Sequence, residues 1–144
     1  MNAFPRLPPQ NVAAAYDRFP EQVRDQLMTA RRLVFEAAAA KFESVGPLTE
    51  TLKWGEPAYL TEATKSGSTI RLGVLRSMPG RGAALFNCQT TLVDTFRAHF
   101  SDALLFEGNR AIVFPESEPL PTDALIVCFD LALTYHARKH AGRP

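Results

Sequence analysis

Apolar residues recur at helical spacing over one long stretch near the start of the chain. Pro20 and Glu21 are typical of a helix beginning, and Val45-Gly46-Pro47 is typical of a helix end. Apolar side chains repeat every three or four residues between them: Val23, Leu27, Ala30, Val34 and Ala37. This spacing predicts an amphipathic helix that ends near Ala40. The charged residues off this stripe are expected in water: Arg24, Asp25, Arg31, Arg32 and Glu36.

Shorter segments with alternating apolar and polar residues follow this helix. Residues 48–53, 58–60, 70–75 and 84–87 are predicted to be strands, because period-two alternation is typical of a half-buried strand. Their links are too short for helical crossovers, so the strands should form an antiparallel meander. Residues 77–82, which hold two glycines and a proline, are expected to form a turn or a flexible loop.

The second half of the chain predicts a helix, a hairpin and a final helix. Gln89-Thr90-Thr91 opens the first of these helices, and Thr122 is expected to cap the last. Apolar residues flank Glu107-Gly108-Asn109-Arg110, a hairpin signal because Gly and Asn tolerate positive φ. The whole order predicts an α+β fold, in which an antiparallel sheet packs against the N- and C-terminal helices in two layers.

Length, charge and composition narrow the classes of protein to consider. The 144 residues suit one domain, and residues 1–10, with three prolines, are expected to be an N-terminal arm before a short helical turn capped by Asn11. A net charge of +1 does not indicate binding to nucleic acid or to an acidic membrane surface. The longest uncharged apolar run, residues 124–129, is far shorter than the ~20 residues of a membrane span. No signal peptide is visible, so a cytoplasmic location is expected.

The most unusual stretch is Trp54-Gly55-Glu56-Pro57, which contains the only tryptophan. Proline and glycine favour a kinked, extended segment here. A Glu56 carboxylate beside Trp54 and Tyr59 either anchors a ligand or closes a corner of the fold, with Trp54 in the core. If Arg71 shares a sheet face with Glu56, the two should pair. Otherwise the basic residues of this region either bind a small anion or are solvated: Lys65, Arg71, Arg76 and Arg81.

Other candidate residues carry weaker signals. Cys88 precedes a helix and is either a reactive thiol or, more in keeping with its type, a buried inert one, which is also expected of Cys128. His136 and His140 have the spacing of two ligands of one metal, but the intervening Arg138-Lys139 repels a cation. We therefore predict no metal site, no cofactor and no catalytic constellation.

Residues 12–38 followed by the segment Glu50 to Tyr59 resemble the YdhG-like family, a widespread bacterial family of unknown function. The residues that match the family signature are Glu50, Trp54, Gly55, Pro57 and Tyr59. Leu120-Pro121 before the final helix also fits, so the resemblance covers nearly the whole chain. It implies a compact, frataxin-like α+β domain.

Some members of that family have been proposed as iron chaperones that feed iron–sulfur assembly. Such a role needs a carboxylate surface, whereas the first long helix mixes acidic with basic residues, so iron delivery is the alternative here. The leading hypothesis is a non-enzymatic binding domain with a cleft lined by Trp54, Glu56, Tyr59 and Arg71. The cleft would take a small polar molecule or a protein partner. The domain would be a monomer or, through an open sheet edge at residues 107–110, a homodimer.

Overall fold

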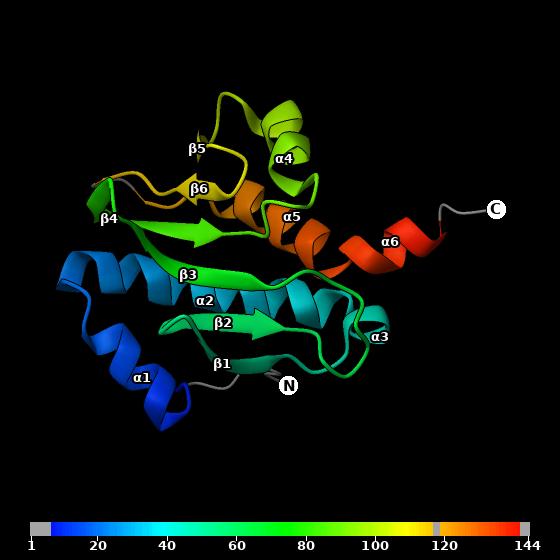
Figure 1. Cartoon of the computed structure of the whole chain (residues 1–144), viewed down its shortest axis with the longest axis horizontal. Coiled ribbons are helices and arrows are strands. Elements are labelled where there is room, and N and C mark those ends of the chain that lie inside the picture. Colours follow the sequence, from blue (N-terminus) through cyan, green and yellow to red (C-terminus); the bar gives the residue numbers. More distant parts are fainter. Residues whose placement is uncertain (1–6, 117–118, 142–144) are drawn as a thin grey trace.

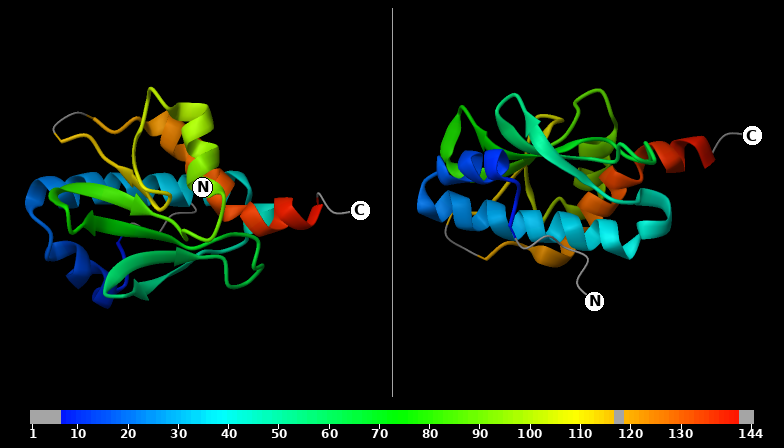
Figure 2. Two further views of the ribbon diagram at one scale, coloured as in Figure 1. Left: turned by 45° about the horizontal axis from the view of Figure 1, so that its top comes forward. Right: turned by 90° about the horizontal axis from the view of Figure 1, so that it is seen from below.

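A six-stranded antiparallel sheet and a layer of helices on one of its faces form the molecule (Figure 1). The structure is a computed structural model that describes residues 7–116 and 119–141. The right-hand view of Figure 2 shows the sheet above the long helix α2 (Glu21–Ala40), and none of the described helices covers the opposite face of the sheet. The predicted α+β class and the predicted order of helices and strands are both confirmed.

The strands lie in the order β1-β2-β3-β4-β6-β5, and every neighbouring pair is antiparallel. The first four form the predicted meander, and the β5–β6 hairpin adds to it through β6. The edge strands are therefore β1 and β5. The bounds are β1 (Thr49–Lys53), β2 (Glu56–Leu60), β3 (Ile70–Leu75), β4 (Met78–Leu85), β5 (Leu105–Glu107) and β6 (Ala111–Val113).

Helices α2 and α5 pack against each other and against the sheet. The long helix α2 packs on β3 and β4 and runs against α5, which also touches β3. The smaller helices cover the ends of this layer, with α1 against β1 and β2. The bounds are α1 (Gln10–Asp17), α2 (Glu21–Ala40), α3 (Phe42–Val45), α4 (Leu92–Phe100), α5 (Thr122–Leu133) and α6 (Tyr135–Ala141).

The core lies between α2, α5 and the helix-facing side of the sheet. The apolar stripe predicted on the first long helix is buried throughout. It belongs to one core cluster with alternate residues of the strands, such as Ile70, Leu72 and Ile112. The expectation that Arg31 is solvated is wrong, since this residue is only 4% exposed. It follows Leu27 by four residues and precedes Val34 by three, which puts it on the buried face.

Several predicted boundaries are corrected by the structure. Residues 78–82 extend strand β4 instead of forming a loop, so the β3–β4 link is only Arg76-Ser77. Helix α1 already begins at Gln10, which shortens the predicted arm, and residues 1–6 of that arm lie outside the described residues. Neither Asn11 nor Thr122 caps a helix, because α1 and α5 each follow a proline and have no side-chain cap.

The final helix is broken at Thr134, where the loop between β2 and β3 reaches it. The Ser66 carbonyl oxygen accepts hydrogen bonds from the backbone N–H groups of His136 and Ala137, and so satisfies the first turn of α6. Gly67 lies so close that an added Cβ would come within 2.3 Å of the Leu133 carbonyl oxygen. Only glycine fits this contact, which the alternating pattern of the sequence does not reveal.

We predict that Gly67→Ala lowers the free energy of unfolding by about 1–3 kcal/mol, because the new methyl group meets helix backbone that cannot move aside without repacking. The matched control is Gly80→Ala, where an added Cβ meets nothing within 4 Å. This control should change stability by less than about 0.5 kcal/mol. Urea unfolding of the three proteins measures both effects, and equal losses would contradict the close packing of residue 67.

Candidate functional site

The tryptophan of the sequence signature lies on a tight turn and projects into solvent. Trp54 and Gly55 are the two residues between β1 and β2, with φ of 55° and 77°. Positive φ at both positions is the pattern of a type I′ hairpin turn. The Trp54 side chain is 90% exposed. The expectation of a kinked, extended segment is therefore wrong, and so is the alternative in which Trp54 belongs to the core.

A bulky side chain at positive φ is uncommon in folded proteins. The left-handed region costs a residue with a Cβ roughly 1–2 kcal/mol, which Asn and Asp offset better than Trp. Gly55 has no such cost. The hairpin thus holds Trp54 in a conformation that its own chemistry does not favour, and places its ring in water. Such backbone outliers cluster at functional sites.

Glu56 and Arg71 form an ion pair on the face of the sheet that carries no helix. The Arg71 Nη1 to Glu56 Oε1 distance is 2.5 Å, and each side chain is about a quarter exposed. The conditional prediction that the two residues pair if they share a face is therefore confirmed. Residue 73 supplies the space, because an added Cβ on Gly73 would lie 2.2 Å from Glu56 Oε2. Burial raises the pKa of the Glu56 carboxyl, and the Arg71 and Arg110 guanidinium groups offset part of that rise.

Tyr59 does not share this surface. It lies three residues after Glu56 on the same strand, and side chains of a strand alternate between faces. Tyr59 therefore points toward the helices and is fully buried. The expectation that Trp54, Glu56, Tyr59 and Arg71 line one cleft is wrong in this respect. The structure brings Glu56 and Arg71 together, places Trp54 at the adjacent turn, and separates Tyr59 from all three.

A buried polar network surrounds Tyr59 on the helix side of the sheet. Arg31 of α2 donates two hydrogen bonds to Glu50 of β1, from Nε to Oε2 at 2.6 Å and from Nη2 to Oε1 at 3.0 Å. Tyr59 of β2 donates to Glu50 Oε2 at 2.8 Å. The Tyr16 hydroxyl of α1 lies 2.5 Å from the Tyr59 hydroxyl. Since Tyr59 gives its only proton to Glu50, Tyr16 must be the donor to Tyr59.

The network joins four elements and leaves its polar atoms paired. The side chains of Arg31 and Glu50 are only 5% and 6% exposed. Among the described residues, no buried side-chain nitrogen or oxygen lacks a hydrogen-bond partner. Phe35 adds an apolar wall, with its ring 5.0 Å from the Arg31 guanidinium carbon and edge-on to Tyr59. The network fixes the β1–β2 hairpin against α1 and α2, so its role in the fold is structural.

Electrostatics in the network follow from burial. Burial raises the pKa values of both Tyr59 and Tyr16 well above that of a free phenol, and the Glu50 carboxylate raises them further. Burial alone would lower the pKa of Arg31. The hydrogen bonds and the charge of Glu50 outweigh this effect, so the pKa of Arg31 is raised. Both phenols therefore stay neutral, and Arg31 stays charged, across the physiological range.

The other sequence candidates lie apart from this region. Cys88 is exposed, so the buried alternative for it is wrong, whereas Cys128 is buried as expected. Burial raises the pKa of the Cys128 thiol to about 12. His136 and His140 are exposed on α6. Within the described part of the chain, no three His, Cys, Asp or Glu side chains come together as a metal site requires.

Comparison with known proteins identifies no relative of the chain. No protein-family model, no curated protein and no solved structure matches it. Over residues 7–116 and 119–141, no helix is both long and apolar enough to cross a membrane. Any assignment of function therefore depends on the geometry of the chain itself.

We predict that Glu50→Gln lowers the free energy of unfolding by about 3–5 kcal/mol, because it removes the carboxylate that compensates a buried guanidinium. The control is Glu36→Gln, which breaks the Arg32–Glu36 pair on the surface of α2. That loss should stay below about 1 kcal/mol. Chemical unfolding of both variants measures the two losses of unfolding free energy. Similar losses would mean that the buried pair contributes no more to stability than a surface pair.

Stability should also fall at alkaline pH. The folded-state pKa values of Tyr16 and Tyr59 are raised, so both contribute stability that is complete below the unfolded pKa of about 10 and declines as pH rises above it. Each tyrosine should contribute about 1.4 kcal/mol per pH unit to the decline. Tyr16→Phe should reduce the slope of this decline by about 1.4 kcal/mol per pH unit. Tyr135→Phe should not reduce the slope, because hydrogen bonding to Thr91 lowers the pKa of Tyr135. An unchanged slope in Tyr16→Phe would contradict the assignment.

Proposed function

We propose that this chain is a non-enzymatic docking domain that binds an acidic segment of a protein partner through Trp54 and the helix-free face of the sheet. The exposure of Trp54 on a tight turn at positive φ is the observation that carries the proposal. Membership of the YdhG-like family and a cytoplasmic location are parts of the same proposal that come from the sequence alone.

The fold has a use for four of the five signature residues. Glu50 and Tyr59 belong to the buried network, and Gly55 is the second turn residue. Pro57 is buried in β2 and lies just outside the residues that pair with β3, so its missing N–H removes no bond from that pairing. Trp54, by contrast, is 90% exposed, so packing against the described residues does not account for an indole at this position. Exposed tryptophans are enriched among residues that dominate binding energy at protein interfaces, where they fill a pocket of the partner.

The surroundings of Trp54 favour an acidic partner. Lys53, which precedes it, is exposed, and so is Arg76 in the β3–β4 turn. Since β2 and β3 are antiparallel with Ala58 opposite Arg71, the two turns lie at the same end of the sheet (Figure 1). Farther along this face, Glu56 is already neutralised by Arg71. Complementary charge on a partner would speed encounter and make binding weaker at high salt.

A protein partner suits this geometry better than a small molecule does. Small-molecule sites are concave and enclose most of the ligand, whereas Trp54 stands out from the molecule. For iron delivery, the alternative, the described residues offer no cluster of three metal-ligating side chains. The α2 surface also alternates acidic with basic residues. The proposal is therefore made for a protein partner.

The test is selection of a displayed library of random dodecapeptides on the immobilised protein. The enriched peptides should carry several Asp or Glu residues together with apolar ones, and their affinity should fall as salt rises. Trp54→Asn should weaken binding of a selected peptide by at least tenfold, the loss typical of a central aromatic anchor. Asn tolerates positive φ, so the turn and the stability of the fold should survive.

Phe42→Gln is the matched control, because Phe42 is another exposed aromatic residue, 58% exposed, on helix α3. This variant should bind the same peptides with unchanged affinity. If Trp54→Asn binds as tightly as the wild type, or if the enriched peptides are not acidic, the proposal is wrong.

A further inference from the structure

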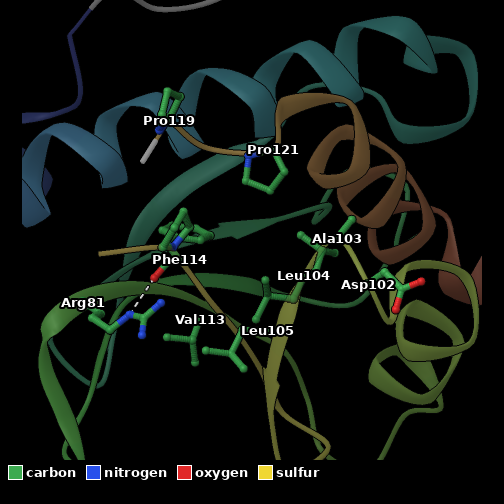
Figure 3. A pocket seen from close by; sticks show the side chains of 11 residues that line it. Arg81, Asp102, Ala103, Leu104, Leu105, Val113, Phe114, Pro119 and Pro121 are labelled. Carbon is green, nitrogen blue, oxygen red and sulfur yellow. Dashed lines mark hydrogen bonds between the residues drawn. The ribbon is translucent and has the colours of Figure 1, made fainter. Parts of the chain in front are cut away.

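A separate cavity of about 320 Å³ lies at the β5–β6 edge of the sheet (Figure 3). In the strand order this edge is the one farthest from β1, so the cavity is distinct from the Trp54 turn. Its floor is apolar and comes from Leu104 and Leu105, before and in β5, and from Val113 of β6. Pro115, Pro119 and Pro121 form a wall that offers no backbone N–H donor.

The wall of the cavity is held in place by α2. Gln26 donates from Nε2 to the Pro115 carbonyl oxygen at 2.5 Å, and Gln22 donates to the Glu116 carbonyl oxygen. These bonds attach the segment after β6 to the long helix α2. The cavity is thus largely formed before any ligand arrives, as small-molecule sites usually are.

One cation, the Arg81 guanidinium, faces the apolar floor of this cavity. Arg81 Nε donates to the Phe114 carbonyl oxygen at 2.8 Å, which fixes the guanidinium at the cavity and leaves the two terminal amino groups for another acceptor. No carboxylate among the described residues lies within ion-pair distance of it. Figure 3 shows Asp102 on the opposite side of the apolar floor, with its carboxylate turned away from Arg81.

We infer that this cavity binds a small monocarboxylate with an apolar body. The carboxylate would accept two parallel hydrogen bonds from the terminal amino groups of Arg81, the geometry that a guanidinium matches best. The hydrocarbon part would lie on Leu104, Leu105 and Val113, against the proline wall. The Arg81 cavity does not involve the Trp54 surface, so binding at one of these two sites can be absent while binding at the other is present.

The test is an NMR titration of the ¹⁵N-labelled protein with 3-phenylpropionate and with its uncharged amide. The acid should shift the amide signals of the cavity residues in a saturable way and bind at least tenfold more tightly than the amide. Arg81→Gln should abolish that difference. Asp102→Asn, which removes the only acidic side chain among the described residues that line the cavity, should leave binding unchanged or tighten it.

A second variant avoids any effect of Arg81 on the fold. Leu105 is 48% exposed, so Leu105→Glu should fold normally while placing a negative charge beside the carboxylate, and should weaken binding of the acid more than that of the amide. Equal affinity for acid and amide in the wild type would overturn the inference. So would shifts confined to residues outside the cavity, or the absence of any saturable shift.

Discussion

The bidentate ion pair between Arg31 and Glu50 is the interaction on which the arrangement of this protein depends. It lies in the core, where an unpaired charge would be costly, so the two residues must meet in a defined geometry. Arg31 belongs to α2 and Glu50 to the edge strand β1. Their pairing, extended by Tyr59 and Tyr16, holds the β1–β2 hairpin and α1 against the long helix.

The side chains on the two faces of β2 take part in different interactions. Tyr59 faces the helices and completes the buried network, while Glu56, three residues earlier, faces away from them and pairs with Arg71. Between the first strand and the second, the chain must turn within two residues, which forces positive φ on Trp54. A hairpin anchored this firmly can display a large aromatic side chain in water without support from neighbouring side chains.

Hydrophobic periodicity was sufficient to predict the α+β class, the long helix and the order of helices and strands along the chain, because burial imposes a period of 3.6 or 2 on the sequence. It could not identify the buried pair, because a charged residue is by default expected at the surface. The signal was present nonetheless, since Arg31 occupies the same helical face as Leu27 and Val34. The cavity at Arg81 could not be predicted from the sequence, because its residues come from segments whose contact depends on the packing of the whole chain.

The fluorescence of Trp54 reports whether the hairpin displays its indole in water, because no other indole contributes. A side chain displayed on the turn should emit like tryptophan in water, and acrylamide should quench it nearly as well as it quenches free tryptophan. That result, obtained on the folded protein, would support a hairpin that presents Trp54 to a partner. Blue-shifted emission with strong protection from acrylamide would place the indole in the interior, and the hairpin would then present no side chain to a partner.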